Sequence, residues 1–168
     1  ADRAERARKE RMHVESTDTA TLWTDYNVTS AQSGKTYRVA LRGWEPGESY
    51  CSCPDFRKNT LGVCKHILHV QRKVKSRFPA TVRKSRFRRH DVSVHLQSGR
   101  ELELRVALPE QVDRSVSALV RPIRDKPITD ARDLLSRVRK LSARGYDVNI
   151  YPDAEELLNH RLFQDQIS

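Results

Sequence analysis

The amino-acid sequence predicts an α+β protein, in which a small module of ββα type is followed by an α+β region with a β-hairpin and helices. Two patterns indicate this class. Several short runs alternate apolar and polar residues and are rich in Val, Thr and Tyr, as half-buried strands are. Other stretches repeat apolar residues at the spacing of an amphipathic helix. Every cysteine also falls within residues 51–66, which points to one local site.

The first half begins with a short charged helix over residues 3–11 and continues as strands. The runs MHVES, TLWTDYNVTS and KTYRVALRG have strand composition, and Tyr37, Val39 and Leu41 alternate in the third. The turn-rich SAQSGK joins the second run to the third. We therefore expect a hairpin here.

The turn of this hairpin contains Ser33-Gly34-Lys35-Thr36, which ends like a phosphate-binding loop. The full motif needs a glycine five positions before Gly34, where this chain has Thr29. A strand-like run also follows Lys35, where the motif requires a helix. We interpret the stretch as a glycine turn without nucleotide binding.

A basic amphipathic helix is expected after the cysteines. Between residues 63 and 74, Ile67, Val70 and Val74 repeat at helical spacing, while the basic residues of the stretch face elsewhere. Pro79 should end this helix, and RFPATVRKSRFRR reads as a linker or a loosely packed crossover.

The second half reads as a hairpin followed by helices and a last strand. DVSVHLQSGRELELRVAL alternates apolar residues on both sides of a Ser-Gly turn. PEQVDRSVSALV places Val112, Val116, Leu119 and Val120 on one helical face, and TDARDLLSRVRKLSARG is a stronger helix with Thr129 or Asp130 as its cap. YDVNIY alternates as a strand, and DAEELLNHRLFQ starts a final helix. The expected organisation is a module over 1–80, a basic linker over 81–90 and an α+β accessory region over 91–168.

The basic residues are concentrated in one segment. Residues 56–90 contain twelve Lys or Arg and no Asp or Glu, whereas the other 133 residues hold twenty bases and twenty-two acids. Such a segment attracts polyanions, so we expect nucleic acid, and DNA in particular, as its partner. The alternative is a solvated basic helix and linker that aids solubility. The predicted nucleic-acid contacts are Arg57, Lys58, Arg72, Lys73, Lys75, Arg83, Lys84, Arg86, Arg88 and Arg89.

The cysteines follow the pattern Cys51-x-Cys53, ten residues, Cys64-x-His66. Three thiolates and one imidazole suit tetrahedral zinc, and four protein ligands leave no open position for water. We therefore expect a structural Zn²⁺ that staples the first module. His69 is the competing fourth ligand, and a catalytic Cys/His pair is disfavoured because thiolates that share a metal are blocked as nucleophiles.

At these residues the sequence resembles the SWIM zinc-finger family, in the form associated with bacterial SWI/SNF-type helicases. The stretch YCSCPDFRKNTLGVCKHILHV carries the resemblance, which covers residues 12–75. It implies Cys51, Cys53, Cys64 and His66 as zinc ligands, and a DNA- or protein-binding module that accompanies a helicase motor. The order of elements in the second half is similar to the region between the finger and the motor core. The chain is then a fragment of a longer helicase or a stand-alone accessory protein.

We do not expect this chain to be an enzyme by itself. It has no complete phosphate loop and no acidic metal-binding box after a strand, so ATP hydrolysis would need a longer parent protein. Asp153, Glu155 and Glu156 form an acidic helix start, where carboxylates interact favourably with the positive end of the helix dipole. The alternative to nucleic-acid binding is a protein-interaction adaptor that docks onto a motor or another partner.

Two further expectations concern location and base contacts. No run of eighteen apolar residues occurs and the charged N-terminal stretch lacks the apolar core of a signal peptide, so we expect a cytoplasmic protein without a membrane partner. The resemblance implies a bacterial protein, located at the nucleoid if it binds DNA. Aromatic residues could stack on unpaired bases, although packing is their commoner role. These aromatic residues are Trp23, Trp44, Phe56, Phe78 and Phe87.

Overall fold

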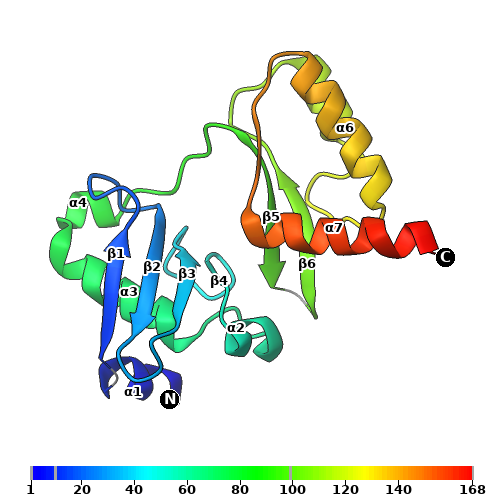
Figure 1. Ribbon diagram of the computed structural model, residues 1–168. Helices are drawn as coiled ribbons and strands as arrows, with labels where there is room; N and C mark the ends of the chain where they lie inside the picture. Colours follow the sequence, from blue (N-terminus) through cyan, green and yellow to red (C-terminus); the bar gives the residue numbers. More distant parts are fainter. Residues whose placement is uncertain (1, 10, 99, 168) are drawn as a thin grey trace. The chain divides into compact units, whose positions relative to one another are not determined.

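The computed structural model describes residues 2–9, 11–98 and 100–167 and confirms the α+β class (Figure 1). The chain forms two compact units, made mainly of the residues up to Phe87 and of those from Arg88 onward. The first contains α1 (Asp2–Lys9), β1 (Met12–Ser16), β2 (Asp25–Ser30), β3 (Thr36–Ala40), β4 (Tyr50–Cys51), α2 (Pro54–Asn59), α3 (Lys65–Arg77) and α4 (Ala80–Arg83). The second contains β5 (Val92–Ser98), β6 (Leu102–Ala107), α5 (Arg114–Val120), α6 (Ala131–Ala143), β7 (Val148–Ile150) and α7 (Pro152–Ile167).

The sheet of the first unit is larger than a ββα module. Four strands pair antiparallel in the order β1-β2-β3-β4, with Val14 opposite Val28 and Val28 opposite Tyr37. Along β1 the residues alternate between buried and exposed, as half-buried strands do. The predicted β2–β3 hairpin is confirmed, and β1 and the two-residue β4 extend it on either side.

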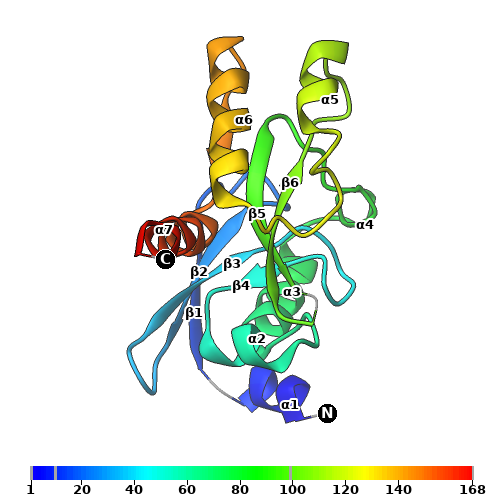
Figure 2. The same cartoon turned by 90° about the vertical axis from the view of Figure 1, so that its right-hand side faces the viewer.

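Helix α3 covers one face of this sheet and contacts β2, β3 and β4 (Figures 1 and 2). Its predicted apolar stripe is confirmed, because Ile67, Val70 and Val74 are all buried. Burial of each such side chain contributes about 1.5–3 kcal/mol. Helix α1 packs against α3, and the Arg3 guanidinium donates two hydrogen bonds of 3.0 Å to the carboxylate of Asp55.

The turn between β2 and β3 is the glycine turn that the sequence predicts. Gly34 has φ of 71°, in the left-handed region that favours glycine, and its N–H donates to the Ser30 carbonyl at 2.8 Å. Strand β3 starts at Thr36, directly after Lys35. The stretch therefore leads into a strand, which is the wrong context for a phosphate-binding loop.

The segment after α3 is folded against the first unit as far as Phe87, although the sequence suggests a linker or loose crossover there. It contains the short helix α4, and the indole N–H groups of Trp23 and Trp44 donate to the carbonyls of Ser85 and Arg83. Acceptors of this kind belong to the backbone, so side-chain patterns do not reveal them.

The second unit has a three-stranded sheet in the order β6-β5-β7. The predicted hairpin forms β5 and β6, and β7 joins the other edge of β5 in parallel, with Val92 opposite Val148 and Val94 opposite Ile150. Helices α5 and α6 contact each other, and α6 also contacts β7 and α7 (Figure 2). The buried core includes Val92, Val94, Leu96, Leu104, Val106, Val116, Val120, Leu134, Leu141 and Leu158.

Two helix starts of the second unit can be compared with the sequence prediction. Helix α5 begins at Arg114 with Asp113 at the N-cap position, so Val112 precedes the helix, where the sequence placed it on the helical face. Helix α6 has the expected cap, because the Asp130 carboxylate accepts from the Asp133 N–H at 3.0 Å. Within the described ranges, no helix combines the length and the apolarity needed to cross a bilayer.

Candidate metal centre

Four ligand side chains converge where β4, α2 and α3 meet. Cys51 ends β4, Cys53 is the residue before α2, Cys64 is the residue before α3, and His66 lies in the first turn of α3. Their ligand atoms all lie within 4.8 Å of one another. The predicted set is thus brought together, and His69 does not belong to this group of described residues.

The spacing of these atoms fits a tetrahedral ion. The His66 Nδ1 lies 3.8 Å from both the Cys51 Sγ and the Cys64 Sγ. With Zn–S bonds of about 2.3 Å, two sulfurs on a tetrahedral zinc are about 3.8 Å apart, and an imidazole nitrogen is slightly closer. Because no two of the four ligand atoms are more than 4.8 Å apart, three sulfurs and one nitrogen could surround one metal ion.

The backbone around Cys53 presents its sulfur to the centre. Pro54 occupies the first turn of α2, where its fixed φ favours the helix and its missing N–H costs nothing. The Phe56 N–H donates to the Cys53 Sγ at 3.3 Å. Such a bond and the adjacent helix N-terminus favour a thiolate over a thiol.

Aromatic contacts fix the elements that carry the ligands. Phe56 is buried and meets Tyr50 edge to face, with centroids 5.2 Å apart, which holds α2 against β4. The Tyr37 ring on β3 lies 5.1 Å from the His66 imidazole. The ligands therefore sit on braced elements on both sides of the centre.

A tight turn joins the two ligand pairs. The sequence suggests a loop over residues 54–63, but α2 occupies its first part. The Asn59 side chain holds the remaining residues of the turn, because it accepts from the Leu61 N–H at 2.7 Å and donates to the Val63 carbonyl at 3.0 Å. Gly62 has φ of 74°, and a Cβ there would collide with the backbone of Gly47. Proline after the capping residue and Asp55 in the first turn are the sequence signals that could have identified α2.

The centre is closed to solvent, since none of the four residues is more than 3% exposed. Burial, with the hydrogen bonds to Cys53 and Cys64, raises the pKa of the Cys51 thiol, while hydrogen bonds from Cys51 and Cys64 lower the pKa of Cys53. One thiolate is thus stabilised by the other two thiols, and further ionisation is opposed by charge repulsion. A cation would remove that repulsion, so the four residues could hold a metal ion.

The predicted nucleic-acid contacts are spread over both units. Those in the first unit lie on α2, on α3 and in the segment after it, whereas Arg88 and Arg89 belong to the second unit. Arg89 is half-buried and donates to the buried Ser93 hydroxyl, so it is engaged within its own unit. Lys73 and Arg83 are also half-buried, and the exposed members are Arg57, Lys58, Arg72, Lys75, Lys84, Arg86 and Arg88.

The aromatic candidates for base stacking are occupied by packing. Phe56 and Trp23 are buried, and Trp44, Phe78 and Phe87 are half-buried. The Trp23 and Trp44 rings meet at 5.1 Å, and the Arg42 guanidinium lies 4.9 Å above the Phe87 ring. These contacts agree with packing, which is the commoner role of such residues.

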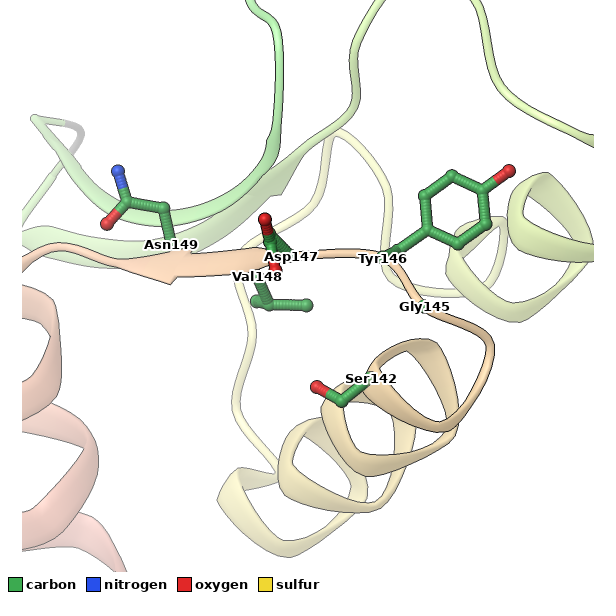
Figure 3. Close-up of a pocket in the computed structure, with 6 residues that line it drawn as sticks. All are labelled: Ser142, Gly145, Tyr146, Asp147, Val148 and Asn149. Atoms are coloured by element: carbon green, nitrogen blue, oxygen red, sulfur yellow. The ribbon is translucent and has the colours of Figure 1, made fainter.

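The second unit has an open pocket at the end of α6, lined by Ser142, Gly145, Tyr146, Asp147, Val148 and Asn149 (Figure 3). Its polar side chains do not converge. The Tyr146 ring points away from Ser142 and its hydroxyl donates to Asp113 at 2.6 Å.

Asp153 and Glu155 lie in the first turn of α7, near the positive end of the dipole, as capping carboxylates do. This position is typical of carboxylates that stabilise the start of a helix.

Comparison with known proteins does not add a family: no family model, curated protein or solved structure matches this chain.

Proposed function

We propose that the first unit is a SWIM-type zinc module that binds DNA through its basic residues, as the accessory region of a SWI/SNF-type helicase or translocase. The observation that carries the proposal is the position of α3. Cys64 is its N-cap residue and His66 lies in its first turn, while its later turns carry the exposed Arg72 and Lys75. One helix thus joins the metal site to the cationic surface.

Zinc is the metal that the ligand set favours. Three sulfurs and one imidazole are soft or borderline ligands, and magnesium and calcium prefer oxygen. The complete shell gives the ion a structural role, in which it ties the start of α3 to β4 and α2. Elemental analysis of the purified chain should give about one zinc per molecule, and Cys64→Ser should lower this content sharply. A metal-free, natively folded chain would contradict the proposal.

The charge distribution supports a nucleic-acid partner. Residues 56–90 contain no carboxylate, so no acidic group within this segment offsets the field of its cations. Binding through such residues depends mainly on phosphates and therefore weakens steeply with salt, with a log–log slope of about −0.9 per duplex phosphate neutralised. We expect little dependence on base sequence.

A matched pair of variants tests the surface. Lys84→Ala with Arg86→Ala removes two exposed cations of the first unit, and Arg139→Ala with Lys140→Ala removes two from the exposed side of α6. In fluorescence anisotropy with a labelled DNA duplex at several salt concentrations, the first pair should weaken binding and reduce the slope by about 0.9 for each phosphate that is no longer neutralised. The second pair should leave the slope near that of the wild type. Equal behaviour of the two pairs would reject this surface.

The alternative function is a protein adaptor that docks onto a motor or another partner. One observation favours it: Phe163 and Ile167 lie one turn apart on α7 and are 59% and 71% exposed. If this function is correct, Phe163→Ser with Ile167→Ser should abolish binding to a helicase motor domain in calorimetry. DNA binding should then be unaffected by both charge-removal pairs.

A further inference from the structure

Two tryptophans of the first unit bond to the backbone of one distant segment. The Trp23 Nε1–H donates to the Ser85 carbonyl at 3.0 Å, and the Trp44 Nε1–H donates to the Arg83 carbonyl at 2.9 Å. Their rings meet edge to face, with centroids 5.1 Å apart and planes at 65°. A packed indole satisfies its N–H with an acceptor, so this pair fixes two nearby points of the segment.

Further contacts fix the segment on both sides of these points. Helix α4 begins directly after Pro79, whose carbonyl accepts from the Val82 and Arg83 N–H groups at 3.0 Å. Beyond Ser85, the guanidinium carbon of Arg42 lies 4.9 Å from the centroid of the Phe87 ring. Residues 79–87, called here the docked segment, are therefore held along their length.

Trp44 also contacts α3. The Lys75 ammonium lies 5.2 Å from the centroid of its ring, and the Gln71 side chain donates to the Trp44 carbonyl at 3.1 Å. The same residue thus links α3 with the docked segment. The two stretches that these contacts join both carry exposed cations, namely Arg72 and Lys75 on α3 and Lys84 and Arg86 in the docked segment.

We infer that Trp23 and Trp44 are positioning residues for nucleic-acid binding, which hold the docked segment beside α3 so that their cations form one phosphate-binding surface. The inference rests on the proposed function. The indoles themselves contact no nucleic acid in this role, because Trp23 is buried and the Trp44 N–H is occupied by Arg83. Their contribution is to order the segment before the partner arrives.

This role predicts a specific signature in binding data. If the docked segment is released, its cations still reach phosphates, but the segment must be ordered during binding. Affinity then falls while the number of phosphates neutralised, and with it the salt slope, stays the same. A variant that lacks a phosphate-binding cation behaves differently, because both its affinity and its salt slope decrease.

The experiment uses Trp23→Phe and Trp44→Phe in the full zinc-loaded chain. Each variant removes one indole N–H and keeps an aromatic ring. Amide hydrogen exchange should become faster in residues 83–87, and affinity for a labelled DNA duplex should fall about threefold to tenfold, with an unchanged salt slope. Phe163→Leu, an aromatic change at an exposed site of α7, is the matched control and should alter neither measurement.

Phe87→Ala provides a second variant if the tryptophan variants lose zinc or unfold. It removes the half-buried ring beneath Arg42 and leaves both indoles in place, so exchange should rise in the docked segment and affinity should fall at constant slope. Faster exchange with wild-type affinity, unchanged exchange, or a slope reduced by about one would each overturn the positioning role. If the wild-type chain itself binds no DNA, it is the proposed function that fails, and the inference fails with it.

Discussion

The two units of this chain differ in charge and in the residues that are buried in them. Residues 1–90 contain twenty Lys or Arg and nine Asp or Glu, whereas residues 91–168 contain twelve and thirteen. The first unit places four metal-ligating side chains among its buried residues, and one of its four strands has only two residues. The buried hydrophobic core of the second unit consists of aliphatic residues and contains no cysteine among its described residues.

The difference in buried residues indicates what a metal ion could contribute to the first unit. A metal centre can add folding energy to that of an apolar core, because metal binding and folding are coupled. The first unit can then expose many basic side chains on a short framework. The second unit has no such group of ligands in the part of the chain that the structure describes, so its stability must come from aliphatic packing.

Metal removal should have the largest effect, because it should unfold the first unit and leave the second unit folded. Metal binding to structural sites of this kind is worth about 10 kcal/mol or more, which exceeds the stability of most small domains. Treatment with a strong chelator, or Cys64→Ser, should therefore unfold residues 12–75. Hydrogen exchange measured along the chain is the readout, with the amides of β5, β6 and α6 as the internal control. Equal loss of protection in both units would contradict independent stabilisation.

A cavity in the second unit should have the converse effect. Leu134 on α6 is buried, and Leu134→Ala should lower the free energy of unfolding of that unit by about 2–5 kcal/mol. Leu135→Ala, at the half-buried neighbouring position, is the matched control with a smaller expected cost. Denaturant unfolding followed by hydrogen exchange measures both. Zinc content should stay at the wild-type level, and a loss of zinc in Leu134→Ala would show that the units depend on each other.

Gly62→Ala should weaken the metal centre through the turn that joins its ligand pairs. The alanine would be strained by the positive φ and would collide with the Gly47 backbone, at an expected cost of about 1–3 kcal/mol. Gly34→Ala is the control, because it has a similar φ but open space around its Cβ position. Competition with a coloured zinc chelator should show weaker zinc binding for Gly62→Ala alone. Equal zinc affinities would mean that the turn does not position the ligands.

The smallest effect near neutral pH should come from Tyr26, and it appears only in alkali. Burial raises the pKa of Tyr26 to about 12, and its hydroxyl donates to the Leu22 carbonyl at 2.7 Å. Since the folded pKa lies above the unfolded value of about 10, the contribution is complete below pH 10 and is lost as pH rises through 12. Alkaline titration of tyrosinate absorbance should show a transition near pH 12 that Tyr26→Phe removes. A Tyr26 that titrates near pH 10 would contradict this.

The sequence predicted the ligand group because its chemistry is local. Cys51, Cys53, Cys64 and His66 lie within sixteen positions, and their residue types are sufficient to indicate a shared ion. The hairpins and the helices α3 and α6 were also predicted, because their apolar residues repeat with a clear period. Amphipathic patterns report which side of an element is buried, and this was enough for the α+β class.

Other features depend on partners that a pattern does not identify. Alternation indicated a strand at Val148–Ile150, but not that it would pair in parallel with β5. The docking of residues 79–87 depends on backbone carbonyls that accept from two indoles, and every residue has such a carbonyl. Arg89 looked like an exposed cation until its bond to the buried Ser93 was known.

The parallel pairing of β7 with β5 has a consequence for the order of events during synthesis on the ribosome. Strand β7 is the last of the described strands, and Val148 at its start pairs with Val92 of β5, 56 positions earlier (148 − 92). The first unit can fold once its own residues have emerged. In contrast, one edge of β5 must stay unpaired while α5 and α6 are synthesised. Translation speed through residues 99–147 should therefore affect the yield of the second unit more than that of the first.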